Sequence, residues 1–386
     1  MFEIGQAEID AVARVIRSGE LFRYGPKGRT KWCERFERAL ARKIGVKYAI
    51  TTTSGTASLI CALTAAGIGP GDEVIVPAYT FIATALAPMA CGAVPIIAEI
   101  DETLTLDPAD VERKISRYTK AVIPVHMRGL PCDMRAIRRI ARRRKLTIIE
   151  DACQAVGGSY RGKRLGSLGD VGTFSFNFFK NISCGEGGAV LTDDLGLYER
   201  AFIQHDGGCS FFTPAGAFGT AFFAGMNFRV SEIQGAILLE QLKRLDPILR
   251  RLRTRAAAMR EPLAAAKSFR LSRSNDVEGD CGLTIPLLFD AEPDALAFIE
   301  RHEKDAGLGR PIDTGRHVYS NWEPVMQRRG SYDRRLDPFR LARRKLTYTR
   351  DMCPVSTDLM QRTVCVAVPY EATVAEARRV AKRLVE

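Results

Sequence analysis

The chain has 386 residues, of which 46% are hydrophobic and 26% charged, values that exclude a disordered, collagen-like or coiled-coil protein. Its net charge of +12 is compatible with affinity for a phosphorylated or carboxylated small molecule, but the basic residues are dispersed and form no nucleic-acid-binding motif. The ten cysteines form no C-x-x-C pair and the four histidines lie far apart, which disfavours a zinc site. With no apolar run of membrane-spanning length and no signal-peptide pattern at the start, we expect a cytoplasmic protein with reduced thiols that binds neither nucleic acid nor membranes.

Between residues 30 and 150, segments with helical spacing of apolar residues alternate with short β-like runs. The helices are expected at 30–43, 54–66, 80–91, 108–116 and 133–144, and the strands at 47–51, 73–79, 94–98, 120–124 and 145–150. This alternation predicts an α/β fold in which parallel strands are joined by right-handed crossovers.

The sequence changes character after this region. From 157 to 191 glycine is dense, and the β-like runs at 171–176 and 187–192 have no long helix between them. The segment 230–265 is helical in pattern, but proline predicts breaks at Pro247 and near Pro262. A strand at 281–289 and helices at 295–307 and 376–386 follow.

These patterns predict two domains. A large domain with a mostly parallel sheet is expected at 1–250 and a smaller α+β domain at 251–386, with the first 25 or so residues packing against the small domain.

Two glycine-rich runs resemble nucleotide-binding loops without meeting their requirements. GIGPGD at 67–72 follows a helix and precedes a strand, the reverse of the dinucleotide-binding order, so it is predicted to be a turn. The run 157–163 ends in Lys163, but Arg164 occupies the position where a P-loop needs Ser or Thr. A nucleotide-hydrolysing enzyme and a dehydrogenase are therefore disfavoured.

Three other features are candidates for a functional site. Ser54-Gly55-Thr56 opens a helix after a strand, where free N–H groups favour an anion; a simple helix cap is the alternative. Glu150-Asp151 ends a buried strand, at the edge where parallel sheets bind ligands, with Gln154 three residues on; a surface turn is the alternative. Lys180 lies in a glycine-bounded aromatic run, GTFSFNFFKNISCGEGG. An apolar setting favours the neutral, nucleophilic amine that Schiff-base chemistry requires, whereas a lysine reaching solvent is the ordinary alternative.

Together these features describe a phosphate seat, a carboxylate and a shielded lysine within one α/β domain. Pyridoxal 5′-phosphate carries a phosphate, a basic ring nitrogen and an aldehyde, so it would use all three.

The same residues resemble the DegT/DnrJ/EryC1/StrS family of sugar aminotransferases, which have the aspartate-aminotransferase fold (pyridoxal-phosphate fold type I). The matching runs include SGTASL, GDEVIVPAYTFIAT, EDACQAVGGSYRGKRLGSLGDVGTFSF, KNISCGEGGAVLT and MNFRVSEIQGAILLEQL, in order over about 30–245. The resemblance implies that Lys180 binds the cofactor covalently and then moves the proton. It also implies that Asp151 keeps the pyridine nitrogen protonated and that Gln154 hydrogen-bonds the ring hydroxyl.

The resemblance assigns the remaining cofactor contacts as well. Gly55, Thr56 and Ser175 would bind the phosphate, Phe81 would stack on the ring, and Asn227 would reach the phosphate of a neighbouring subunit. The expected unit is thus a homodimer with shared active sites. Core packing is the alternative for Phe81.

The resemblance also sets the expected reaction. Some relatives have histidine in place of the lysine and are sugar dehydratases, so Lys180 favours transfer of an amino group from L-glutamate or L-glutamine to a keto or aldehyde sugar or a cyclitol. A non-transaminating pyridoxal-phosphate enzyme, such as a dehydratase or epimerase, and a non-catalytic sensor stay open.

Four runs, LFRYGPKGRTKW, AEIDETLTLDP, VHMRGLPCDM and VEGDCG, resemble the branch that contains the 8-amino-3,8-dideoxy-manno-octulosonate aminotransferase. Arg128 stands where many members have an aromatic residue, and the 205–224 loop is distinct. Arg23 and Arg128 are candidates to meet an acidic acceptor, with surface arginines as the alternative.

Overall fold

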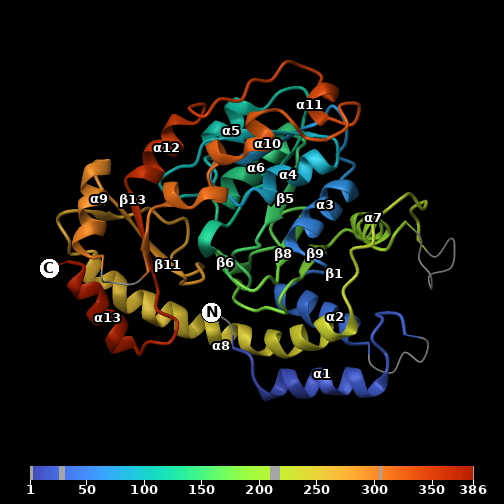
Figure 1. Cartoon of the computed structure of the whole chain (residues 1–386), viewed down its shortest axis with the longest axis horizontal. Coiled ribbons are helices and arrows are strands. Elements are labelled where there is room, and N and C mark those ends of the chain that lie inside the picture. Colours follow the sequence, from blue (N-terminus) through green and yellow to red (C-terminus); the bar gives the residue numbers. More distant parts are fainter. Residues whose placement is uncertain (1–2, 26–30, 209–217, 304–306, 386) are drawn as a thin grey trace.

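The computed structural model describes residues 3–25, 31–208, 218–303 and 307–385 (Figure 1). Parts of four expected segments (21–32, 205–224, 295–307 and 376–386) therefore lie outside the described residues. The longer helices are α1 (Gln6–Ser18), α2 (Trp32–Ile44), α3 (Gly55–Ala65), α4 (Ala83–Ala90), α5 (Pro108–Lys114), α6 (Met134–Arg144), α7 (Leu195–His205), α8 (Glu232–Leu263), α9 (Glu292–Arg301), α12 (Pro354–Gln361) and α13 (Val374–Arg383). The short ones are α10 (Glu323–Met326) and α11 (Pro338–Leu341).

A seven-stranded sheet in the order β1-β9-β8-β5-β4-β2-β3 forms the centre of the molecule (Figure 1). Its strands are β1 (Tyr48–Thr52), β2 (Glu73–Pro77), β3 (Val94–Ala98), β4 (Thr119–Val122), β5 (Thr147–Asp151), β8 (Val171–Ser175) and β9 (Gly188–Thr192). From β8 to β3 neighbouring strands are parallel, which confirms the predicted mostly parallel sheet. β9 runs antiparallel to both its neighbours, because the link 176–187 contains no helix that could cross over the sheet.

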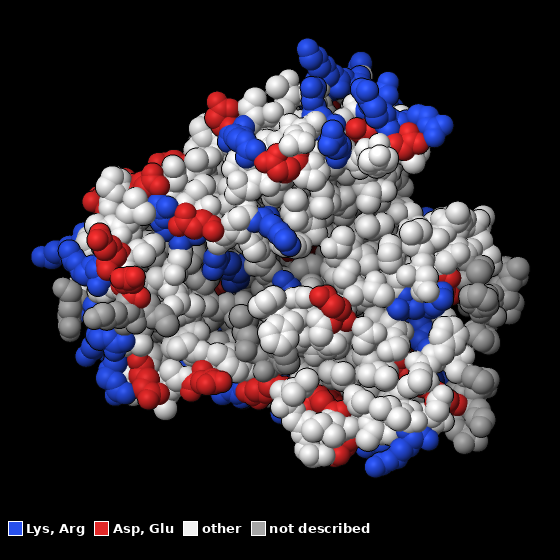
Figure 2. Space-filling model, in the orientation of Figure 1, with Lys and Arg blue, Asp and Glu red and all other residues white. Residues whose placement is uncertain are grey.

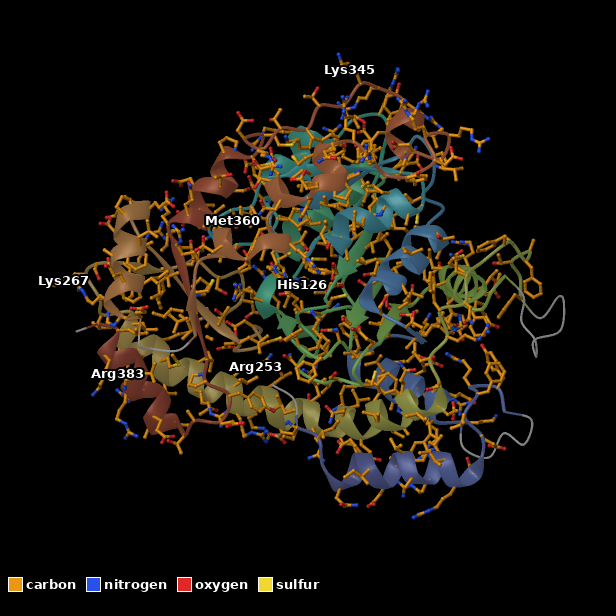
Figure 3. All side chains as sticks on the ribbon, viewed as in Figure 1. His126, Arg253, Lys267, Lys345, Met360 and Arg383 are labelled. Carbon is orange, nitrogen blue, oxygen red and sulfur yellow. The ribbon has the colours of Figure 1, made fainter. Side chains whose placement is uncertain are left out.

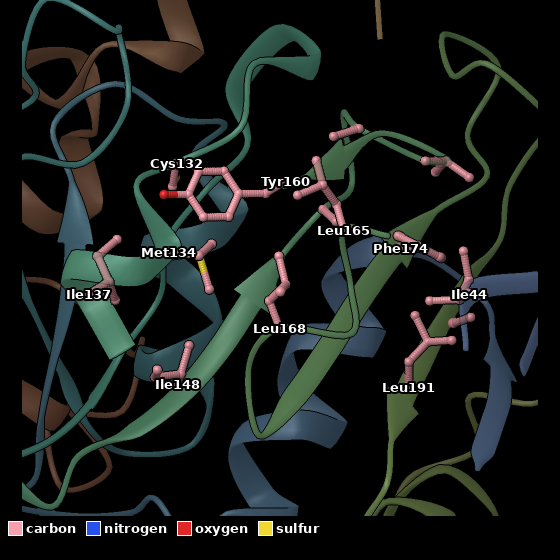
Figure 4. Close-up of a cluster of buried hydrophobic side chains, with 14 of the residues drawn as sticks. Ile44, Cys132, Met134, Ile137, Ile148, Tyr160, Leu165, Leu168, Phe174 and Leu191 are labelled. Atoms are coloured by element: carbon pink, nitrogen blue, oxygen red, sulfur yellow. The ribbon is translucent and has the colours of Figure 1, made fainter. Parts of the chain in front are cut away.

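Helices cover both faces of this sheet, because successive strand residues point to opposite sides. Ile75 packs toward α2, α6 and the first half of α8, in the core that Figure 4 shows in part. Val74 and Val76 pack toward α3, α4 and α7 on the other face. Fully apolar strands are typical of a parallel sheet buried on both sides.

The helix α8 runs without interruption from Glu232 to Leu263, so the predicted break at Pro247 is wrong, whereas the break predicted near Pro262 coincides with the end of the helix. Proline removes one backbone hydrogen bond, but its fixed φ is compatible with a helix. Packing compensates for the loss: the first half of α8 lies against α1 and α2, and the second half against α13 (Figure 1). Tertiary contacts rather than local propensity therefore determine this helix.

A four-stranded antiparallel sheet, β10-β11-β13-β12, lies beyond residue 270. Its strands are β10 (Arg270–Leu271), β11 (Thr284–Leu288), β12 (Leu308–Gly309) and β13 (Thr363–Ala367). Apolar residues of the second half of α8, of α9 and of α13 form its core. In contrast, Tyr319, Trp322 and Cys353 pack in the core of the large sheet. The domain division at residue 250 stays a prediction, and α8 passes through that position as one helix.

The N-terminal helix α1 lies along the first half of α8 (Figure 1). Glu8 accepts hydrogen bonds from Arg244 Nε and Gln241 Nε2, both at 2.9 Å. Near the start of the chain, Glu3 accepts one from the Tyr370 hydroxyl at 3.3 Å, so residues before α1 also contact the C-terminal part.

Basic side chains are dispersed among acidic ones on the face shown in Figure 2, and gather near α11 at the top. Within the described ranges, no helix combines the length and the apolar character needed to cross a membrane.

Candidate active site

A cavity of about 860 Å³ lies at the carboxyl ends of the parallel strands. Parallel α/β sheets bind ligands at this edge. Seven of the eight predicted site residues line it, namely Gly55, Thr56, Phe81, Asp151, Gln154, Ser175 and Lys180. Asn227 does not line this cavity. The fold therefore brings together residues that are up to 125 positions apart in the sequence, from Gly55 to Lys180.

The start of α3 forms the first side of the cavity. The Ser54 hydroxyl accepts a hydrogen bond from Ala57 N at 3.0 Å and caps the helix, so the cap predicted as an alternative is present. This cap does not bond the N–H groups of Gly55 and Thr56, which have no acceptor within α3 because they belong to its first residues. The cap is compatible with the predicted anion site, because it satisfies only one of the free N–H groups and leaves the others available.

Gly55 lies where no larger residue fits. A Cβ atom there would be 2.9 Å from both Cys153 Sγ and Ser175 Cβ. The backbone of α3 thus approaches the ends of β5 and β8 closely, and Ser175 adds a hydroxyl beside the helix start.

Asp151 ends β5, and its side chain is almost fully buried at 4% exposure. Thr84 Oγ1 donates to its Oδ2 at 2.9 Å, and Cys153 N donates to its Oδ1 at 3.1 Å. Because Thr84 gives its only proton to Asp151, the 2.8 Å hydrogen bond between Thr80 and Thr84 must have Thr80 as donor. This chain of hydroxyls holds the carboxylate in one orientation.

Glu150, the other member of the predicted acidic pair, points to the opposite side of the strand. It is fully buried and does not line the cavity. His126, near the centre of Figure 3, donates to it from Nε2 at 2.9 Å. Cys132 N donates to Nδ1 of the same ring at 3.0 Å, so the ring's single N–H lies on Nε2. Glu150 is therefore a structural residue and Asp151 the one available to a ligand.

Lys180 lies in the hairpin link between β8 and β9, where its N–H donates to Asn177 O at 3.0 Å. The side chain is half-buried and borders the cavity. Its aromatic neighbours do not enclose it as expected: Phe178 and Phe179 are 59% and 71% exposed. Phe176 and Ile182 of the same link are buried, so only part of the link packs on the chain's own core.

Gln154 and Phe81 border the cavity near Lys180. Arg128 N donates to Gln154 Oε1 at 3.1 Å. Since a backbone N–H only donates, this bond fixes the amide so that its NH₂ group is turned away from Arg128. The ring of Phe81 lies 5.6 Å, between centroids, from the imidazole of His317. Burial and the positive charges of Arg128 and Lys180 lower the pKa of His317, which is thus neutral near pH 7.

Sequence reasoning missed several lining residues. Thr84 is part of a run that the resemblance matched, but only the structure shows that it contacts Asp151. Arg316 and His317 come from the C-terminal part and carry no local signal of proximity to Lys180.

The predictions for Arg23 and Asn227 have different outcomes. Arg23 does not line the cavity; it donates to both Glu37 carboxylate oxygens, at 2.9 and 2.8 Å, so its predicted contact with an acceptor is wrong. Asn227 is exposed and forms a β-bridge with Asp206. Its predicted contact with a neighbouring subunit stays a prediction.

The cavity suits pyridoxal 5′-phosphate in its donor and acceptor groups. The N–H groups at the start of α3 match a phosphate, the fixed carboxylate of Asp151 matches a protonated ring nitrogen, and the amine of Lys180 matches an aldehyde. The absence of a Cβ at Gly55 lets the start of α3 approach Cys153 and Ser175 closely.

Comparison with known proteins agrees with this interpretation. A GDP-perosamine synthase of Caulobacter vibrioides is 46% identical over 216 residues, which are 55% of this chain and 56% of that protein. An L-glutamine:2-deoxy-scyllo-inosose aminotransferase of Streptoalloteichus tenebrarius is 36% identical over 370 residues, 88% of this chain and 86% of that protein.

Solved structures give the same result for the fold. A 3-amino-5-hydroxybenzoic acid synthase superposes with a TM-score of 0.81 at 28% identity, covering 100% of this chain and 97% of its own. DesV of S. venezuelae has a TM-score of 0.79 at 30% identity, with coverages of 98% and 94%. A sequence model of the DegT/DnrJ/EryC1/StrS aminotransferase family matches residues 3–309. The chain therefore belongs to the DegT/DnrJ/EryC1/StrS aminotransferase family, whose members are pyridoxal-phosphate enzymes of fold type I.

Proposed function

We propose that this protein transfers an amino group from L-glutamate or L-glutamine to a keto or aldehyde carbon of a sugar or cyclitol, in amino-sugar biosynthesis in the cytoplasm. The observation that carries the proposal is that Lys180, Asp151 and the start of α3 line one cavity. The acceptor class is a nucleotide-linked sugar, an octulosonate or a cyclitol. The names of the relatives support the first and the last of these, since one relative makes GDP-perosamine and another acts on 2-deoxy-scyllo-inosose.

Each residue has a defined task in this proposal. Pyridoxal phosphate, when bound, supplies an aldehyde that carries amino groups between substrates and a ring that withdraws electrons. Lys180 Nζ holds the cofactor and then takes up and returns the substrate's proton. Asp151, held by Thr84, keeps the proton on the ring nitrogen. Gln154 donates from its NH₂ group to the ring hydroxyl, and Phe81 packs on the ring face.

The proposal includes a homodimer with shared active sites. Asn227 is exposed and outside its own chain's cavity, as a residue that binds a neighbour's phosphate must be. Next to it, Met226 is 56% exposed, and Phe178 and Phe179 beside Lys180 are also exposed. A subunit interface would cover such exposed apolar side chains. The oligomeric state of the purified protein tests this part.

The reaction type is tested by the keto acid formed from the donor. Transamination predicts one 2-oxo acid per molecule of aminated acceptor, whereas a dehydratase or epimerase forms no aminated acceptor. Lys180→Ala should abolish release, and Lys163→Ala, which changes an exposed lysine, should leave it unchanged. Substantial amine transfer by Lys180→Ala, or product without keto acid, would contradict the proposal.

A further inference from the structure

Arg128 is a cation in the cavity that lacks an acidic partner among the residues that the structure describes. It lies in the short 3₁₀ helix Met127–Gly129, and its side chain is half-buried. Among the described residues its guanidinium has no ion pair with a carboxylate, and only Nε has a hydrogen-bond partner. The two Nη atoms are not sealed in the protein interior, so they face the cavity.

Two other arginines with little exposed surface pair with carboxylates. Arg260 lies 2.9 Å from Asp280, and Arg310 lies 2.7 Å from Glu292. Burying a guanidinium without an anion is unfavourable, because it cannot lose its charge at physiological pH. Other half-buried arginines without an ion pair among the described residues, such as Arg200 and Arg253, donate to backbone carbonyls outside the cavity. Arg128 instead lines the cavity and donates from its side chain only to a neutral hydroxyl.

The guanidinium is also held in a fixed orientation. Its Nε donates to the hydroxyl of Tyr79 at 2.7 Å, and Tyr79 is fully buried. Burial raises the pKa of Tyr79 to about 12, so its hydroxyl is neutral and does not neutralise the arginine. The backbone of Arg128 has φ of 53°, a left-handed conformation that costs energy for any side chain with a Cβ and is typical of functional sites.

The carboxylates that line the cavity are engaged elsewhere. Asp151 accepts from Thr84 at 2.9 Å, and Glu186 accepts from Asn177 Nδ2 at 2.8 Å. At the same cavity Arg316 is exposed and has no ion pair within the described ranges. The positive charge at this end of the cavity is therefore available to a ligand.

We propose that the Nη edge of Arg128 binds a carboxylate group of a substrate, with Arg316 adding charge at the entrance. The planar, forked guanidinium matches a carboxylate with two parallel hydrogen bonds. This inference rests on the proposed function, because it places the group in the cavity where the amino group is transferred. The carboxylate has two sources: the α-carboxylate of the amino-acid donor, or an acid group on the acceptor.

The donor source is tested with Arg128→Met, which removes the charge, and Arg128→Lys, which keeps the charge without the fork. The readout is the second-order rate at which L-glutamate converts the holoenzyme to its amine-loaded form. Loss of one carboxylate contact predicts a decrease of about 10- to 100-fold for Arg128→Met, with a smaller loss for Arg128→Lys. Arg135→Met, an exposed arginine on α6 away from the cavity, is the control and should match the wild type.

The acceptor source is tested by equilibrium binding, which needs no turnover. Calorimetry of the amine-loaded protein with D-glucuronate and D-glucose compares two probes that differ in one carboxylate. The wild type should bind glucuronate at least about 10-fold more tightly, and Arg128→Met should remove the difference.

Loss in either measurement supports the proposal and identifies the source. If both Arg128 variants fold, as judged by circular dichroism, and match the wild type in both measurements, the proposal is wrong. A wild type that L-glutamate and L-glutamine do not convert would instead contradict the proposed function. In that case the test of Arg128 uses protein without donor-derived amine and measures its preference for glucuronate over glucose. A preference that the wild type has and Arg128→Met lacks supports the carboxylate site. A wild type without this preference overturns it.

Discussion

Replacing Glu150 by glutamine should destabilise the protein strongly, although the shape of the side chain barely changes. Its Oε1 accepts from His126 Nε2 at 2.9 Å and Gly166 N at 2.6 Å. Its Oε2 accepts from Leu168 N at 2.7 Å and Gly169 N at 2.9 Å. Whichever oxygen becomes NH₂, it meets two N–H donors that cannot accept a hydrogen bond.

The magnitude follows from these four bonds. Hydrogen bonds to a charged group contribute about 1.5–3 kcal/mol each, and the variant loses two of them in a site without solvent. The free energy of unfolding should therefore fall by about 3–6 kcal/mol. The loop at 166–169, which these bonds hold against β5, should loosen first.

Urea titration of wild type and Glu150→Gln, prepared without added cofactor, measures this difference. The control is Glu112→Gln, whose carboxylate is 41% exposed and pairs with surface arginines; it should change stability by less than about 1 kcal/mol. If Glu150→Gln also stays within 1 kcal/mol of the wild type, the hydrogen-bond assignment around Glu150 is wrong.

Two further predictions concern the phosphate seat and the effect of pH. Gly55→Ala should weaken the binding of pyridoxal phosphate at least about 10-fold in a fluorescence titration. The new Cβ would lie 2.9 Å from Cys153 Sγ and Ser175 Cβ, so these residues would have to move. An unchanged affinity would show that the start of α3 does not bind the phosphate. Burial and the charge of Arg23, which lies 3.4 Å from Nε2, lower the pKa of His205 to about 3. The unfolded chain takes up a proton below about pH 6.5 and the native protein does not, so stability should fall as pH falls, by about 2 kcal/mol between pH 7 and pH 5. The variant His205→Gln should lose that part of the pH dependence, and an identical slope in both proteins would refute it.

Local patterns predicted much of the fold because they report directly on burial. The alternation of helical and β-like runs between 30 and 150 gave the strand and helix order, and apolar strands such as β2 require helices on both faces. The continuous helix α8 was not predictable from proline positions, because contacts with α1, α2 and α13 offset the local cost. The direction of β9 depends on a link without a helix, which no single residue encodes.

The candidate site, too, was predictable only in part. Asp151 and the start of α3 were predictable because strand ends and helix starts meet at one edge of a parallel sheet. Lys180 was predictable from the family resemblance, whereas the aromatic enclosure expected for it is not formed, because Phe178 and Phe179 are exposed. The contact of Arg128 with Tyr79 and the position of His317 at the cavity depend on long-range packing. From the sequence alone, Arg23 and Arg128 are equally good candidates for contact with an acidic acceptor, because their different partners are not visible in it.

The absorption spectrum of the purified protein, reconstituted with pyridoxal phosphate, tests the central claim most directly. We expect a visible band from the cofactor bound to Lys180, which L-glutamate or L-glutamine should convert to a near-ultraviolet band as the amino group is transferred. Lys180→Ala should show neither the band nor the conversion, and Lys163→Ala should show both. A protein that stays colourless after reconstitution, or a visible band that neither donor changes, would contradict the account.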